Sequence, residues 1–244
     1  MTVSRLTKIS MRNFTLLCGL LMIFAFGLTL ALPVSAQPAH QKLTVLVPGE
    51  YFKEVLPDKL PTQGWLGLAG KESVWQLAPA TVRAKPSFYM AQNEKTPNAL
   101  DIRVRDPATL LLLKIPGLSA GPLKVVQPNL KQWPDHNIDI KNVIKLPFDG
   151  GNYFLSVKKS GRLWLSQNNL QSPLSESKIN NIEVGEEAAR HAQLLWAGDL
   201  NRDGGLDVVV SFSSLYSINT CVFLSSGLGS RWRISQKHCF QSYI

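Results

Sequence analysis

The feature that most constrains the fold is a short polar loop that runs directly into an apolar segment. The loop spans residues 199–207, and Val208, Val209 and Val210 follow it. β-branched residues favour an extended backbone, and residues 192–196 before the loop also have strand character. The sequence therefore predicts a strand–loop–strand unit, which needs partner strands from the rest of the chain.

The loop carries side-chain oxygens at its positions 1, 3, 5 and 9. Gly204 at position 6 permits a sharp turn. Alternate oxygens with this spacing surround a hard cation such as Ca²⁺, whereas three carboxylates so close together repel one another when no cation is bound. An Asx-rich surface turn without metal is the alternative interpretation. The predicted Ca²⁺ ligands are Asp199, Asn201, Asp203, the carbonyl of Gly205, and Asp207.

The same positions open an EF-hand loop, but an EF-hand needs a bidentate Glu at position 12 and a helix on each side. Position 12 is Val210, within a predicted strand. The segment instead resembles the FG-GAP/VCBS-type repeat, whose D-x-[DN]-x-D-G-x-x-D loop enters an apolar strand; Asn201 replaces the frequent Asp at position 3. The resemblance covers about residues 190–226, in one copy, and implies a calcium-binding loop.

The rest of the chain reads as short strands separated by Gly, Pro and Asn, with little helix. Hairpins are predicted over residues 65–77, 100–115 and 153–165. The fold class is therefore mainly β, with antiparallel hairpins in a sandwich or a propeller-like array. A blade repeat is one possibility, because segments opening at Leu100, Tyr153 and Leu206 are spaced 53 residues apart.

The amino-terminal region has the order of a secretory signal peptide: basic residues, an apolar run and small residues ending at Ala36. Cleavage after Ala36 predicts an exported protein, periplasmic or secreted. The apolar run is also just long enough to span a bilayer, so a membrane anchor formed by an uncleaved segment is the alternative. The expected organisation is a signal peptide at 1–36, a β-rich half at 37–130 and a second at 140–244, or one domain comprising both halves.

Two cysteines remain after cleavage, Cys221 and Cys239, on the arms of an expected hairpin. An even pair in an exported chain predicts a disulfide. Free thiols or a metal pair are the alternatives.

The whole chain has a formal net charge of +9. Removing residues 1–36 takes away three basic residues and no acidic ones, which leaves 23 Lys and Arg against 17 Asp and Glu. The basic residues are scattered rather than interleaved with aromatics on one face, which argues against nucleic-acid binding. We expect an unknown protein or glycan as partner, and no stable membrane insertion after cleavage.

Two further motifs are weak. Residues 117–121 match the G-x-S-x-G nucleophile elbow, but Pro122 and a predicted strand follow where the elbow needs a helix. Residues 135–139 repeat the first three ligand positions of the loop, but Ile140 stands where the glycine should be. Both motifs are interpreted as ordinary turns.

The leading hypothesis is an exported calcium-binding β module with a binding or scaffold role outside the cytoplasm, without catalytic residues. The alternative is an extracytoplasmic hydrolase that acts on a polymer and uses calcium structurally, with acids such as Glu183, Glu186 and Glu187 near the loop. A third hypothesis is an assembly partner that offers the edge of a strand.

Overall fold

A computed structural model describes residues 43–71, 73–88, 97–126, 137–138, 143–175, 191–214, 217–227 and 231–243. Two predicted features lie outside the described residues: the signal segment at 1–36, and the acids Glu183, Glu186 and Glu187. Of the weak motif at 135–139, only residues 137 and 138 are described. Residues Lys42–Ile244 form one compact unit. No helix in the described part of the chain is both long enough and apolar enough to cross a bilayer.

Most of the described residues lie in β-strands, which confirms the mainly β fold with antiparallel sheets. One 3₁₀ turn, η1, spans Lys53–Val55. The strands are β1 Val45–Leu46, β2 Gly49–Phe52, β3 Trp65–Lys71, β4 Val74–Ala80, β5 Arg83–Ser87, β6 Ala99–Arg103, β7 Thr109–Leu113, β8 Gly121–Val125, β9 Asn137–Ile138, β10 Val143–Phe148, β11 Gly151–Val157, β12 Leu163–Gln167, β13 Leu170–Pro173, β14 His191–Asp199, β15 Asp207–Ser213, β16 Ser217–Ser226 and β17 Arg233–Tyr243.

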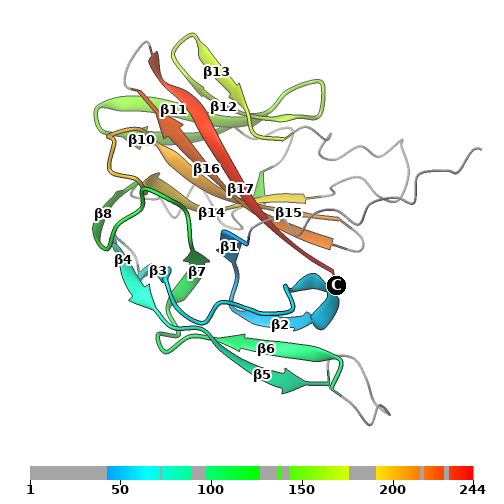
Figure 1. Cartoon of the computed structure of the whole chain (residues 1–244). Helices are drawn as coiled ribbons and strands as arrows, with labels where there is room; N and C mark the ends of the chain where they lie inside the picture. Colours follow the sequence, from blue (N-terminus) through cyan, green and yellow to red (C-terminus); the bar gives the residue numbers. More distant parts are fainter. Residues whose placement is uncertain are drawn as a thin grey trace, which may run out of the picture. The chain divides into compact units, whose positions relative to one another are not determined.

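Within the described residues these strands form three sheets (Figure 1). The largest has ten strands, in the order β1-β7-β3-β4-β8-β14-β15-β16-β17, with β9 added on β14. Its two ends approach each other, since β1 contacts β17 and Thr44 Oγ1 lies 3.1 Å from Nδ1 of His238. The sheet therefore nearly closes on itself. The other sheets have the orders β10-β11-β12-β13 and β2-β6-β5.

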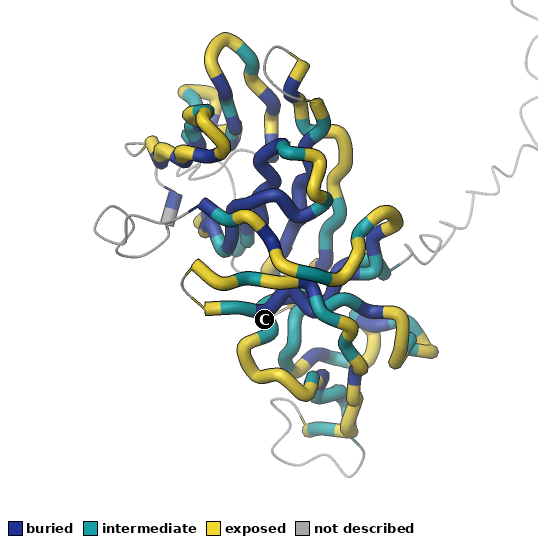
Figure 2. Tube along the Cα trace, turned by 90° about the vertical axis from the view of Figure 1, so that its left-hand side faces the viewer, coloured by how far each residue is buried: buried dark blue, intermediate teal, exposed yellow. Residues whose placement is uncertain are grey.

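Two hydrophobic clusters cover the two faces of β14–β16. The C-terminal cluster combines buried side chains of β10–β12 with Val208 and Val210, and the N-terminal cluster combines those of β1–β4 and β6–β8 with Val209. Successive side chains of a strand point to opposite faces, so both faces of β15 are buried; Figure 2 traces this burial along the chain. Burial on both faces explains why Val208, Val209 and Val210 are all apolar instead of alternating with polar residues.

Of the three hairpins predicted over residues 65–77, 100–115 and 153–165, two are confirmed and one is wrong. β3 pairs with β4 and β11 pairs with β12, as expected. The expected hairpin over 100–115 does not form, because β6 pairs with β2 and β5 whereas β7 pairs with β1 and β3. The turn between them exists, with the N–H of Ala108 donating to Oδ1 of Asp106 at 2.9 Å. A turn reverses the chain direction but does not determine which strands then pair. Of the three segments spaced 53 residues apart, the one that opens at Leu100 therefore does not form a hairpin.

The hairpin of β16 and β17 carries the predicted disulfide. Cys221 and Cys239 are direct cross-strand partners, and their sulfurs are bonded. Their Cα atoms lie 4.1 Å apart, which is slightly less than in most disulfides. A disulfide is typical of proteins in oxidising compartments.

Candidate metal site

The acidic loop connects two strands that are buried on both faces where they adjoin it. β14 ends at Asp199 and β15 begins at Asp207, and the last cross-strand pair is Gly198 with Asp207. The predicted strand–loop–strand unit is thus confirmed. Leu200 is buried in the N-terminal cluster and Leu206 in the C-terminal cluster. Each arm of the loop is therefore anchored in a different part of the core.

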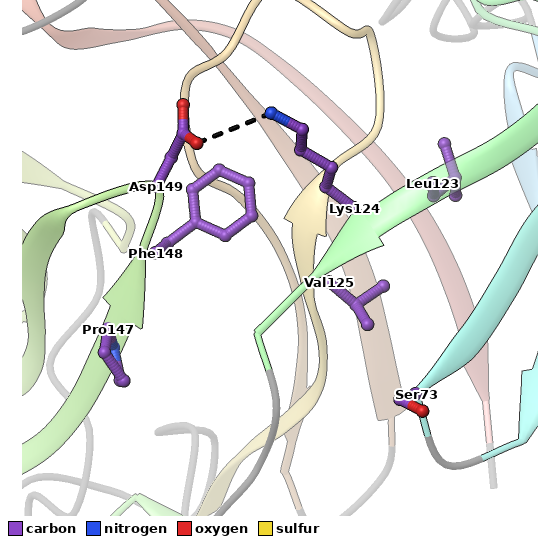
Figure 3. Close-up of a pocket in the computed structure, with 7 residues that line it drawn as sticks. All are labelled: Ser73, Leu123, Lys124, Val125, Pro147, Phe148 and Asp149. Atoms are coloured by element: carbon purple, nitrogen blue, oxygen red, sulfur yellow. Dashed lines mark hydrogen bonds and ion pairs between the residues drawn. The ribbon is translucent and has the colours of Figure 1, made fainter.

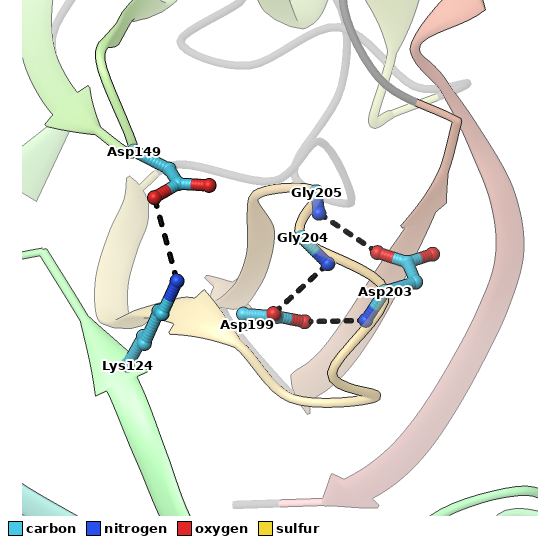
Figure 4. A network of polar contacts seen from close by, with 6 residues as sticks. All are labelled: Lys124, Asp149, Asp199, Asp203, Gly204 and Gly205. Carbon is cyan, nitrogen blue, oxygen red and sulfur yellow. Dashed lines mark hydrogen bonds and ion pairs between the residues drawn. The ribbon is translucent and has the colours of Figure 1, made fainter.

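The first ligand position organises the turn. The carboxylate of Asp199 is buried and accepts hydrogen bonds from the N–H of Asp203 and the N–H of Gly204, each at 3.0 Å (Figure 4). Gly204 has a φ of 84° and Arg202 a φ of 62°, so the chain passes through left-handed conformations here. Glycine adopts such a conformation without strain, which agrees with its predicted place at position 6.

The middle positions are linked to one another. Oδ1 of Asp203 accepts from the N–H of Gly205 at 2.8 Å, and its Oδ2 accepts from Nδ2 of Asn201 at 3.1 Å. Oδ1 of Asn201 in turn accepts from the N–H of Asp203 at 3.2 Å. Asp203 is exposed and Asn201 is half-buried. This part of the loop is therefore accessible to solvent, although its oxygens accept hydrogen bonds within the loop.

Asp207 is fully buried and closes the loop. Its Oδ2 accepts from the N–H groups of Leu200, at 2.7 Å, and Asn201, at 3.3 Å. Its Oδ1 accepts from the N–H of Ser225, on β16, at 2.7 Å. Asp207 thus fastens the loop both to its own first arm and to the neighbouring strand.

The two buried carboxylates carry an electrostatic cost. Burial raises the pKa of Asp207 to about 7, against the lowering effect of the backbone N–H groups of Ser225 and Leu200. Burial also raises the pKa of Asp199, which the N–H of Gly204 opposes and the nearby carboxylate of Asp203 increases. Desolvation disfavours the charged form of each group. A cation bound in the loop would offset this penalty.

The carboxylates keep coordination capacity after these hydrogen bonds. A carboxylate has about four lone-pair positions. The bonds above occupy two on Asp199, two on Asp203 and three on Asp207. However, the described residues contain no group of three or more His, Cys, Asp or Glu side chains gathered tightly enough to hold a metal. The loop thus holds the predicted residues together, with their carboxylates turned toward backbone amides.

Ser225 is a member of this site that sequence reasoning missed. Besides donating its N–H to Asp207, its carbonyl oxygen accepts from Nδ2 of Asn201 at 3.4 Å. It lies 18 residues after Asp207, on a different strand. No spacing rule links a loop to a partner strand at that distance, so no signal in the sequence pointed to it.

A cavity of about 390 Å³ opens close to the loop, between β8 and the end of β10 (Figure 3). Lys124 and Asp149, at its rim, form an ion pair at 3.4 Å. Lys124 is also the cross-strand partner of Asp199, which places this pair beside the loop (Figure 4). The cavity is lined by Ser73, Leu123, Lys124, Val125, Pro147, Phe148 and Asp149.

The weak elbow motif is a turn, as predicted. Gly117 has a φ of 88°, and the chain then enters the strand β8 rather than a helix. Ser119 accepts a hydrogen bond from Nη1 of Arg202, in the acidic loop. Its hydroxyl therefore helps to position a loop side chain.

Comparison with protein-family models finds no matching family, and comparison with curated proteins finds no matching relative. The resemblance of the loop to the FG-GAP/VCBS-type repeat therefore stays a prediction.

Proposed function

We propose that this chain is an exported β module that binds Ca²⁺ in the loop from Asp199 to Asp207 and acts as a binding or scaffold protein. The observation that carries the proposal is the oxygen content of this loop. Two buried carboxylates and one exposed carboxylate lie within nine residues, and each keeps free lone-pair positions after its hydrogen bonds. An all-oxygen donor set of flexible geometry suits Ca²⁺ better than Mg²⁺, which demands near-ideal octahedral coordination.

Export is supported by two independent features. The amino-terminal order of basic, apolar and small residues is that of a signal peptide, and the disulfide of Cys221 and Cys239 is typical of an oxidising compartment. Calcium is abundant outside the cytoplasm, where extracellular modules bind it with a Kd of about 10⁻⁴–10⁻³ M. The partner is an unknown protein or glycan, and the ion serves to hold the loop in one conformation.

The rival hydrolase has less support. The acids that would serve it, Glu183, Glu186 and Glu187, lie outside the described residues. The cavity beside the loop has one carboxylate, Asp149, and this is paired with Lys124. We therefore propose the binding or scaffold role rather than the hydrolase.

The proposal is tested by titrating CaCl₂ into the oxidised, chelator-treated chain while following backbone amide shifts by NMR. We expect saturable shifts at Gly204 and Gly205 with a Kd of about 10⁻⁴–10⁻³ M. Asp203→Asn should weaken binding at least tenfold because it removes a charged ligand. Asp149→Asn is the matched control, an exposed carboxylate nearby, and should bind as the wild type does. A wild-type chain whose loop amides do not respond to calcium would contradict the proposal.

A further inference from the structure

The hydroxyl of Ser225 is a buried polar group without a hydrogen-bond partner. Ser225 has no exposed surface, and its Oγ makes no hydrogen bond to any of the described residues. Buried hydroxyls are almost always paired, so an unpaired one calls for an explanation. The backbone of the same residue is fully engaged with the acidic loop, through Asp207 and Asn201.

The unpaired oxygen faces the loop. An ideal Cβ built on Gly205 would collide with Oγ of Ser225 and would lie 3.0 Å from Oδ1 of Asp203. Oγ of Ser225 therefore occupies the space that a side chain at position 205 would take, and Oδ1 of Asp203 lies at the edge of that space. Glycine at this position lets Ser225 approach the loop this closely.

The strand is locally irregular at the same point. The pairing of β16 with β17 shifts register between Leu224 and Ser225. The paired residues on β17 at these two positions are Gln236 and Ile234, so Ser235 of β17 is the extra residue of the bulge. Bulges are common beside functional sites, and this one adjoins Ser225.

We propose that Oγ of Ser225 is a cation ligand, contributed by β16 to the site whose other ligands lie in the loop from Asp199 to Asp207. This inference rests on the proposed calcium function. Ca²⁺ accepts neutral oxygens together with carboxylates at 2.3–2.6 Å, and the ion supplies the partner that the hydroxyl lacks. The bound ion then joins the β14–β15 loop to β16, the strand that carries Cys221.

The test is the same calcium titration on Ser225→Ala, with Ser226→Ala as control because Ser226 follows on the same strand and is not fully buried. We expect Ser225→Ala to weaken calcium binding about tenfold and Ser226→Ala to leave it unchanged. In chelator, the free energy of unfolding of Ser225→Ala should equal or exceed that of the wild type, because the variant removes an unpaired buried hydroxyl.

A second measurement counts coordinated water. Tb³⁺ bound in place of Ca²⁺ reports its bound water through its luminescence lifetimes in H₂O and D₂O, and Ser225→Ala should gain about one water where the hydroxyl was. Equal calcium affinity in Ser225→Ala and the wild type, or an unchanged water count, would overturn the role of Ser225 and leave the calcium site intact. Failure of the wild type to bind calcium would instead overturn the proposed function, and this inference with it.

Discussion

The β11–β12 turn and the β14–β15 loop both reverse the chain between antiparallel strands, but different interactions close them. The turn between β11 and β12 closes through its own backbone, with the N–H of Gly161 donating to the carbonyl of Lys158 at 2.8 Å and the N–H of Lys158 donating to Arg162 at 3.0 Å. The loop between β14 and β15 closes mainly through carboxylates that accept backbone N–H groups. The first turn needs no side chain, whereas the second contains more oxygen than a turn requires. That surplus is the physical argument for a cation.

The largest effect is expected where the loop depends on a buried carboxylate. Asp207→Ala leaves three backbone N–H groups without their acceptor, two of them in the loop and one on β16. We predict a loss of about 3–5 kcal/mol in the free energy of unfolding, measured by urea denaturation in the presence of chelator.

The matched control lies in the backbone-closed turn. Ser160→Ala, at an exposed position of that turn, should change the free energy of unfolding by less than about 0.5 kcal/mol. If Asp207→Ala and Ser160→Ala lowered the free energy of unfolding equally, the β14–β15 loop would not depend on its carboxylates more than the β11–β12 turn depends on its side chains.

The hairpin of β16 and β17 is held by a disulfide. Removing this bond should give the next largest loss in the free energy of unfolding. Replacing both Cys221 and Cys239 with Ala should lower the free energy of unfolding by roughly 3 kcal/mol, the chain-entropy value for a loop of this length. The cysteines are separated by 18 residues, and Cys221 lies four positions before Ser225. Urea denaturation in chelator measures this loss.

The same double variant should keep its calcium affinity within about twofold, because the disulfide is not a ligand and the β15–β16 pairing holds Ser225 in place. A large loss of calcium affinity would show instead that the covalent bond, rather than the strand pairing, positions the site.

The local parts of this architecture could be predicted from the sequence. The loop, its two flanking strands and two hairpins follow from turn residues and β-branched runs that lie next to one another in the chain. The disulfide followed from an even cysteine count and the compartment. Each of these signals depends on residues close in sequence or on a simple count.

The non-local parts could not be predicted. The turn at Asp106 predicts a reversal, yet β6 and β7 join different sheets because their partners, β2 and β3, come from elsewhere in the chain. Ser225 reaches the loop only because β15 pairs with β16, with Val208 opposite Phe223. The burial of Asp207 depends in the same way on cores formed by segments far from it in sequence, so its raised pKa had no local signal.

The most direct test of the calcium site is thermal unfolding of the wild-type chain in calcium and in chelator. At a calcium concentration a hundredfold above Kd, binding to the folded state alone adds ~2.7 kcal/mol. For a domain of this size that corresponds to a rise in Tm of roughly 5–10 °C. A Tm that rises by this amount with calcium, and not with the same concentration of NaCl, is the result we predict. An identical Tm in calcium and chelator would contradict the account and would make the loop a turn closed by carboxylates alone.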